Sequence, residues 1–130
     1  MPRELILPAL LMTLALASYS YGVWAERLLR DLMPHHVVAF WVGLAFDAVG
    51  TERMIGLARS GMRSGAGHYA FGVAAFALMF AHAAWATWVA ARGTAELRRG
   101  FHRYSLGVWL LWLVPYLGGM IAGMTSGGPP

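Results

Sequence analysis

Residues 69–91 form an apolar stretch that reads YAFGVAAFALMFAHAAWATWVAA. Apart from Tyr69, its only ionisable side chain is that of His82. A helix needs about 20 apolar residues to cross the hydrocarbon core of a bilayer, so the stretch predicts a membrane-spanning helix. Apolar and polar residues do not alternate along it, which argues against a strand.

Three further apolar stretches of similar length surround it. They cover residues 5–24, 36–57 and 104–124. The segments between the four stretches are short, and short connections place consecutive helices antiparallel to one another. The sequence therefore predicts an all-α fold, an integral-membrane up-down four-helix bundle. We expect one transmembrane domain over residues 1–130 that ends in a flexible tail at residues 125–130.

The composition also indicates a bilayer. Hydrophobic residues make up 58 % of the 130 residues and charged residues 12 %, whereas about 25 % of residues are charged in soluble domains. A domain of this size has too little interior to hide so much apolar surface from water. The ten arginines sit in short clusters between apolar stretches, so we expect lipid headgroups and not nucleic acid as their partners. The absence of cysteine excludes disulfides and iron–sulfur clusters.

The arginines are divided unequally between the two ends of the predicted bundle. Six lie on the side of the first and third connections: Arg27, Arg30, Arg92, Arg98, Arg99 and Arg103. Four lie on the other side: Arg3, Arg53, Arg59 and Arg63. Because positive residues favour the cytoplasmic side, this bias predicts a multi-pass protein with both termini outside.

Four histidines and one aspartate lie inside the predicted spans or begin them: His36, Asp47, His68, His82 and His102. Such groups are costly in a membrane and are therefore candidates for function. His68 and His82 are 14 residues apart, which on a helix is about 40° short of whole turns and about 21 Å of rise. Two imidazoles on one face, in opposite leaflets, suit a membrane cytochrome with two b-type haems. The four histidines named here are thus candidate axial ligands of haem iron.

Two ligand arrangements stay open on the side of the first and third connections. In one, His82 shares a haem with His102 or with His36. In the other, His36 pairs with His102, and His82 hydrogen-bonds to Asp47. His36 and His102 are equally compatible with a role as interfacial anchors. Asp47 suits a hydrogen bond to Thr51, one turn on, or to an imidazole that it would orient.

On the opposite side, His68 has no histidine partner. Other side chains there offer weaker ligands or none: Tyr116, Met120 and Met124. Three arginines near predicted helix ends pair either with haem propionates or with lipid headgroups: Arg53, Arg92 and Arg103. The sequence therefore leaves the haem count at one or two per chain.

Four motifs resemble those of the small four-helix bacterial membrane proteins of the HsmA type. They are FWVGLAFDAVGT at 40–51, FAHAAWAT at 80–87, FHRYS at 101–105 and WLVPY at 112–116. The resemblance implies a location in the bacterial inner membrane, haem binding there, and protection from haem toxicity and oxidative stress. It also implies that the five ionisable residues named above face the interior.

The leading hypothesis is an integral-membrane protein that binds haem b through histidine ligands. It would either sequester haem or transfer electrons with a quinol or another redox partner, and as an enzyme it would be a cytochrome b oxidoreductase linked to quinol or superoxide. The alternative is a haem-free proton or metal-ion transporter that uses Asp47 and His82. Gly119 and Gly123 form a G-x-x-x-G pattern, which favours either a homodimer or close contact inside the bundle.

Overall fold

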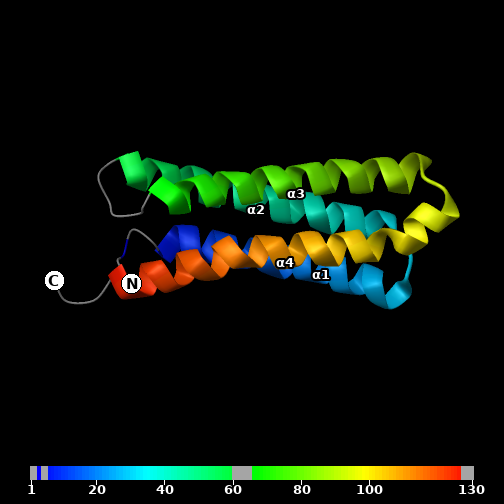
Figure 1. Ribbon diagram of the computed structural model, residues 1–130, viewed down its shortest axis with the longest axis horizontal. Helices are drawn as coiled ribbons and strands as arrows, with labels where there is room; N and C mark the ends of the chain where they lie inside the picture. Colours follow the sequence, from blue (N-terminus) through cyan, green and yellow to red (C-terminus); the bar gives the residue numbers. More distant parts are fainter. Residues whose placement is uncertain (1–2, 4–5, 60–65, 127–130) are drawn as a thin grey trace.

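Four helices run alternately up and down in the computed structural model (Figure 1). They are α1 (Ile6–Leu29), α2 (Pro34–Arg59), α3 (Ala66–Arg92) and α4 (Ala95–Ser126). The structure describes residue 3 and residues 6–59 and 66–126, but not the side chains of residues 57–59, 66–71, 119–120 and 122–126. Within these residues there is no strand. The predicted all-α up-down four-helix bundle is therefore confirmed.

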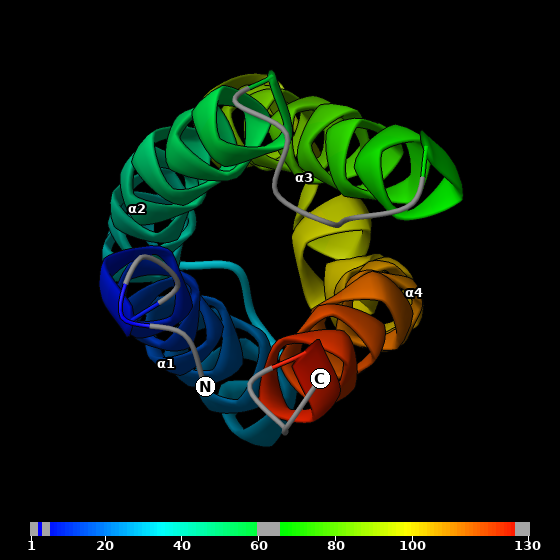
Figure 2. The same cartoon turned by 90° about the vertical axis from the view of Figure 1, so that its left-hand side faces the viewer.

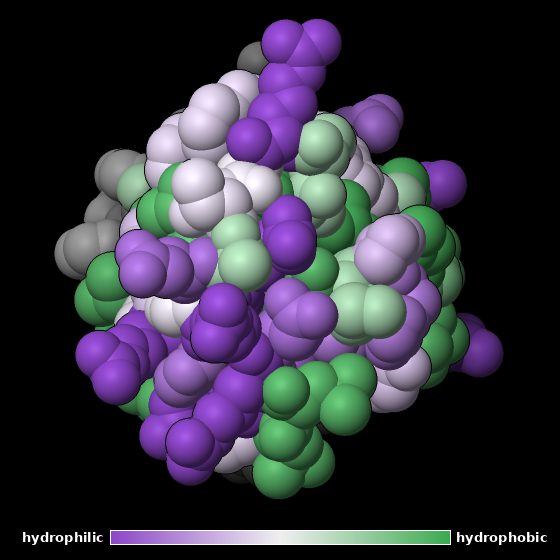
Figure 3. Space-filling model, turned by 90° about the vertical axis from the view of Figure 1, so that its right-hand side faces the viewer, coloured by the Kyte–Doolittle hydropathy of each residue, from purple (hydrophilic) through white to green (hydrophobic). Residues whose placement is uncertain are grey.

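The helices form a ring in chain order (Figure 2). Consecutive helices pack against each other, and α4 closes the ring against α1. The start of α1 and the end of α4 lie at one end (Figure 1). The opposite end carries the short connections 30–33 and 93–94, and we call it the arginine end after six residues: Arg27, Arg30, Arg92, Arg98, Arg99 and Arg103. Hydrophilic side chains gather there (Figure 3).

The helices extend beyond the predicted spans at the arginine end. The first helix continues past residue 24 to Leu29, and the last begins at Ala95 and not near residue 104. Apolar character sets where a span ends, but backbone hydrogen bonding sets where a helix ends. Thr94 caps α4, because its Oγ1 accepts a hydrogen bond of 3.2 Å from the backbone N–H of Leu97. At the other end, α4 covers residues 125 and 126 of the predicted tail, and 127–130 lie outside the described residues.

Two glycines allow α1 and α2 to approach closely. A Cβ atom on Gly43 would lie 2.6 Å from Cδ1 and Cε1 of Tyr19. A Cβ atom on Gly22 would lie 2.5 Å from Cε1 of Phe40. Both distances are far below van der Waals contact, so only glycine fits at these two points.

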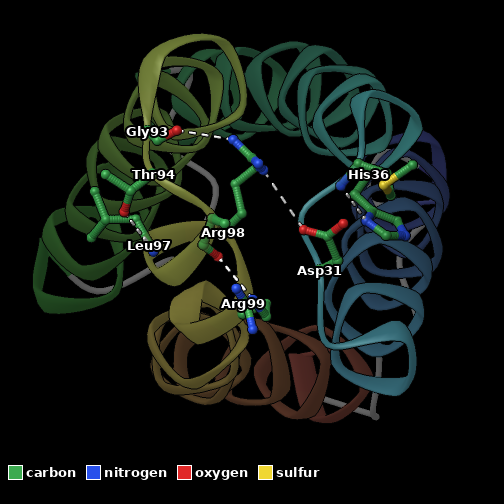
Figure 4. A network of polar contacts seen from close by, with 9 residues as sticks. Asp31, His36, Gly93, Thr94, Leu97, Arg98 and Arg99 are labelled. Atoms are coloured by element: carbon green, nitrogen blue, oxygen red, sulfur yellow. Dashed lines mark hydrogen bonds and ion pairs between the residues drawn. The ribbon is translucent and has the colours of Figure 1, made fainter.

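A network of polar contacts joins the two connections at the arginine end (Figure 4). Arg98 lies with its Nε 3.8 Å from Oδ1 of Asp31 and donates a hydrogen bond of 2.9 Å from Nη1 to the carbonyl oxygen of Gly93. Both charged side chains are partly exposed. The network therefore holds the connection after α1 close to the start of α4.

Two helical segments are long and apolar enough to cross a membrane, among the residues that the structure describes. They are Ile6–Leu29 and Gly72–Arg92, each with a mean hydropathy of 1.6 over its most apolar window.

Candidate functional site

Asp47 lies at the centre of a satisfied network in the bundle interior. Its side chain is buried, and Oδ2 accepts hydrogen bonds of 3.0 Å from the Tyr19 hydroxyl and 3.0 Å from Nε1 of Trp112. Oδ1 accepts the bond from Thr51 at 3.2 Å, as expected from the sequence. Three helices thus direct donors at one carboxyl group. This network fixes the register of α1, α2 and α4, and it leaves Asp47 no contact with an imidazole.

His82 belongs to a different network from Asp47. Its ring is fully buried, and Nε2 lies 2.9 Å from Oγ of Ser105 on α4. The rings of Phe40 and Phe101 lie against the imidazole, with centroid distances of 4.5 and 5.4 Å. The Nδ1 atom is buried without a hydrogen-bond partner among the described residues. The predicted bond between His82 and Asp47 is therefore not present.

His36 acts as a helix cap. It stands at the third position of α2, and its Nδ1 accepts a hydrogen bond of 3.0 Å from the backbone N–H of Met33, just before the helix. Figure 4 shows this contact. An Nδ1 that accepts leaves the proton of a neutral imidazole on Nε2. That arrangement does not suit iron ligation through Nε2.

His102 lines a pocket of about 250 Å³ at the arginine end. The other lining residues are Trp24, Arg27 and Leu28 from the end of α1 and Arg30 from the connection that follows it. Nη1 of Arg27 lies 3.3 Å from Nδ1 of His102. Partial burial and then the positive charges of Arg27, Arg103 and Arg30 lower the pKa of His102. The imidazole is therefore neutral at neutral pH, the form that ligates a metal.

The remaining predicted site residues are scattered. The Tyr116 hydroxyl lies 3.1 Å from Oγ1 of Thr13. The three predicted propionate partners, Arg53, Arg92 and Arg103, are exposed. His68 lies in α3, but its side chain is outside the described residues, as are those of Met120 and Met124. Gly119 and Gly123, which form the G-x-x-x-G pattern, are also among the residues whose surroundings are not described. The homodimer therefore stays a prediction.

In the described part of the chain, the surroundings of His102 suit a haem better than those of His82. Around His82, Ser105 occupies the ligating nitrogen and two phenylalanine rings cover the imidazole, so a porphyrin has no room without repacking. Around His102, the pocket offers an imidazole, two guanidinium groups, and the apolar surfaces of Trp24 and Leu28. These are the groups that a haem needs: an axial ligand, partners for its propionates and contacts for its macrocycle.

No cluster for a bare metal ion is present in the described part of the chain. Groups of three or more histidine, aspartate and glutamate side chains arranged around one point are absent there.

The chain matches no protein-family model, no curated protein and no solved structure. The case for a function therefore depends on the geometry of its side chains.

Sequence reasoning missed the most exceptional interior residue, Glu26. Its side chain has no exposed surface, and neither carboxyl oxygen makes a hydrogen bond with the described residues. A signal was available, because Ala15, Tyr19, Gly22 and Glu26 follow the spacing of one buried helix face, and all four are buried. A charged residue on such a face is a candidate for function.

Proposed function

We propose that the chain is an integral-membrane four-helix protein that binds haem b at the pocket beside His102. The observation that carries the proposal is the combination in this pocket of an imidazole, two arginines and the apolar side chains of Trp24 and Leu28. Membrane insertion, haem binding and the choice of pocket are separate parts of the proposal.

The outer faces of the helices support insertion in a bilayer. Large apolar side chains are exposed on all four helices, for example Leu10, Val42, Phe80 and Leu111. In the apolar windows of α1 and α3, only 28 % of the residues are buried within the protein, whereas a core helix of a soluble protein is mostly buried. Water would oppose such a surface, and lipid chains would cover it.

The pocket beside His102 would lie at the membrane surface. Its arginines and Trp24 are typical of the headgroup region of a membrane. In that region, a haem can keep its charged propionates in water and its apolar macrocycle in lipid. His102 would supply the axial ligand, and Arg27 and Arg30 would pair with the two propionates. Haem b bound there would supply a redox-active iron. The chain's own task is to neutralise the propionates and to cover one face of the ring with Trp24 and Leu28.

The resemblance to HsmA-type proteins supports haem handling in the bacterial inner membrane. Sequestration of haem needs only the pocket, whereas electron transfer also needs a donor and an acceptor. Reduction of the haem-loaded protein by a quinol separates the two roles: reduction at a catalytically useful rate favours electron transfer, and its absence favours sequestration.

Absorption spectroscopy tests the proposal. The full chain is purified in mild detergent from haem-supplemented cells, and oxidised and dithionite-reduced spectra are recorded with a haem count per chain. We expect haem b in the native protein and its loss in His102→Ala. His35→Ala is the matched control, because His35 is an exposed histidine at the same end, and it should keep the haem.

Three outcomes would contradict this assignment. A protein that stays colourless after haem addition would exclude haem binding. Haem loss in His68→Ala but not in His102→Ala would move the site to the opposite end of the bundle. Stoichiometric zinc or manganese without haem would favour the alternative of a metal-ion transporter.

A further inference from the structure

Glu26 is a buried carboxyl group without a positively charged partner among the described residues. No arginine of the described residues lies within ion-pair distance of it, and its oxygens accept no hydrogen bond of normal geometry. An ionised carboxylate in such surroundings loses its hydration and finds no cation to replace it, a cost of several kcal/mol that the neutral acid avoids. Glu26 is therefore stable in the interior when it carries a proton.

Ser105 connects Glu26 to a second titratable group. The Ser105 hydroxyl on α4 is close enough to the Glu26 carboxyl to influence it electrostatically, although the two make no hydrogen bond of normal geometry. The same hydroxyl lies 2.9 Å from Nε2 of His82, which is fully buried on α3. Three helices thus contribute a carboxyl, a hydroxyl and an imidazole to one interior position. A hydroxyl between two titratable groups can both accept and donate a proton.

The other charged groups nearby are already engaged or turned away. On α2, Nδ1 of His36 caps the helix, and its Nε2 is buried and unpartnered. In the connection after α1, Asp31 lies 3.8 Å from Arg98. On α1 itself, Arg27 lies against His102, and Arg30, directly after α1, lines the pocket beside it. Of these groups, His82 is the titratable one that shares Ser105 with Glu26.

We propose that Glu26, Ser105 and His82 form a proton-binding site inside the bundle, in which Glu26 holds the proton and exchanges it with His82 through Ser105. In the exchange, the Glu26 hydroxyl gives its proton to Oγ of Ser105, and Ser105 gives its own proton to Nε2 of His82. The products are a carboxylate and an imidazolium, so charge and atoms balance. The site goes beyond haem binding and does not depend on it.

Infrared spectroscopy of the purified full chain tests the site. We expect a carbonyl band of a protonated carboxyl group at neutral pH that is lost in Glu26→Gln. Glu52→Gln is the matched control, because Glu52 is exposed on α2, and it should keep the band. Asp47 is the other buried carboxyl group. Asp47→Asn removes any band that comes from Asp47 and leaves the band of Glu26. In Ser105→Ala, the band should remain, shifted in frequency, and its exchange with deuterium from D2O should slow.

A measurement on the native sequence keeps the test independent of folding defects. With glutamate labelled at the carboxyl carbon, NMR should show one glutamate that stays protonated at neutral pH, while the exposed glutamates are ionised. A fully ionised set of glutamates would overturn the proposal and would point to a bound cation beside Glu26. Unchanged deuterium exchange in Ser105→Ala would overturn the route through Ser105.

Discussion

His82 on α3 and Ser105 on α4 face each other in the bundle interior with 2.9 Å between Nε2 and Oγ. Since Nδ1 of His82 is buried and unpartnered, this contact is the one hydrogen bond that the described residues give to the ring. We expect Ser105→Ala to destabilise the protein by about 1–3 kcal/mol, because it leaves a buried imidazole with no partner. Thermal unfolding in detergent measures the change.

Ser20→Ala is the comparison for that prediction. Oγ of Ser20 accepts a hydrogen bond of 3.0 Å from Nε1 of Trp109, but this contact is only partly buried. Water or a lipid headgroup can replace it, so the loss should be smaller than in Ser105→Ala. Equal losses of stability in Ser105→Ala and Ser20→Ala would show that burial of the contact between His82 and Ser105 does not add to the stability of the protein.

The close approach of α1 and α2 gives a second prediction. Gly43→Ala would place a methyl group 2.6 Å from the Tyr19 ring and push that ring away from Asp47. Overpacking of this kind costs about 1–3 kcal/mol. Gly56→Ala is the matched control on the same helix, because a Cβ atom there meets nothing within 4 Å. It should stabilise the helix by about 0.5–1 kcal/mol, and unfolding of both variants in detergent checks the opposite signs.

The bond between Tyr19 and Asp47 gives a third prediction. Tyr19→Phe keeps the ring, which packs edge-on against Trp112 at a centroid distance of 5.1 Å, and removes only the hydroxyl donor. We expect a loss of about 1–2 kcal/mol, because the buried carboxyl group keeps its two other donors. Tyr21→Phe is the control, since Tyr21 is exposed. A loss as large in the control would show that the network does not hold the helices in register.

The sequence predicted the part of the fold that depends on local properties. Four long apolar stretches with short connections were sufficient for the number of helices and their antiparallel order. The bond from Thr51 to Asp47 was also predictable, because one helical turn separates the two residues. The other partners of Asp47, Tyr19 and Trp112, are 28 and 65 residues away. Such contacts depend on how the helices slide and rotate against one another, which no local pattern specifies.

The candidate sites were predictable only in part for the same reason. His102 was a candidate, but the arginines beside it are far from it in the chain: Arg27 lies on α1, and Arg30 lies directly after α1. Their proximity depends on α1 continuing to Leu29, beyond the end of its apolar stretch. Glu26 was missed because it follows that stretch in the sequence, and only the extended helix turns it towards the interior.

The lowered pKa of His102 gives a prediction on pH. Partial burial and the charges of Arg27, Arg103 and Arg30 lower it from the ordinary value of 6.5, so the imidazole stays neutral at pH 6.5 and charges only at lower pH. Haem ligated by His102 should therefore be released at a pH below 6.5. Arg27→Gln removes one positive charge, so the midpoint of release should rise, and high salt should raise it in the native protein. Arg53→Gln, at the opposite end, is the control. NMR titration of His102 measures the pKa directly, and an equal midpoint in both arginine variants would contradict the role of Arg27.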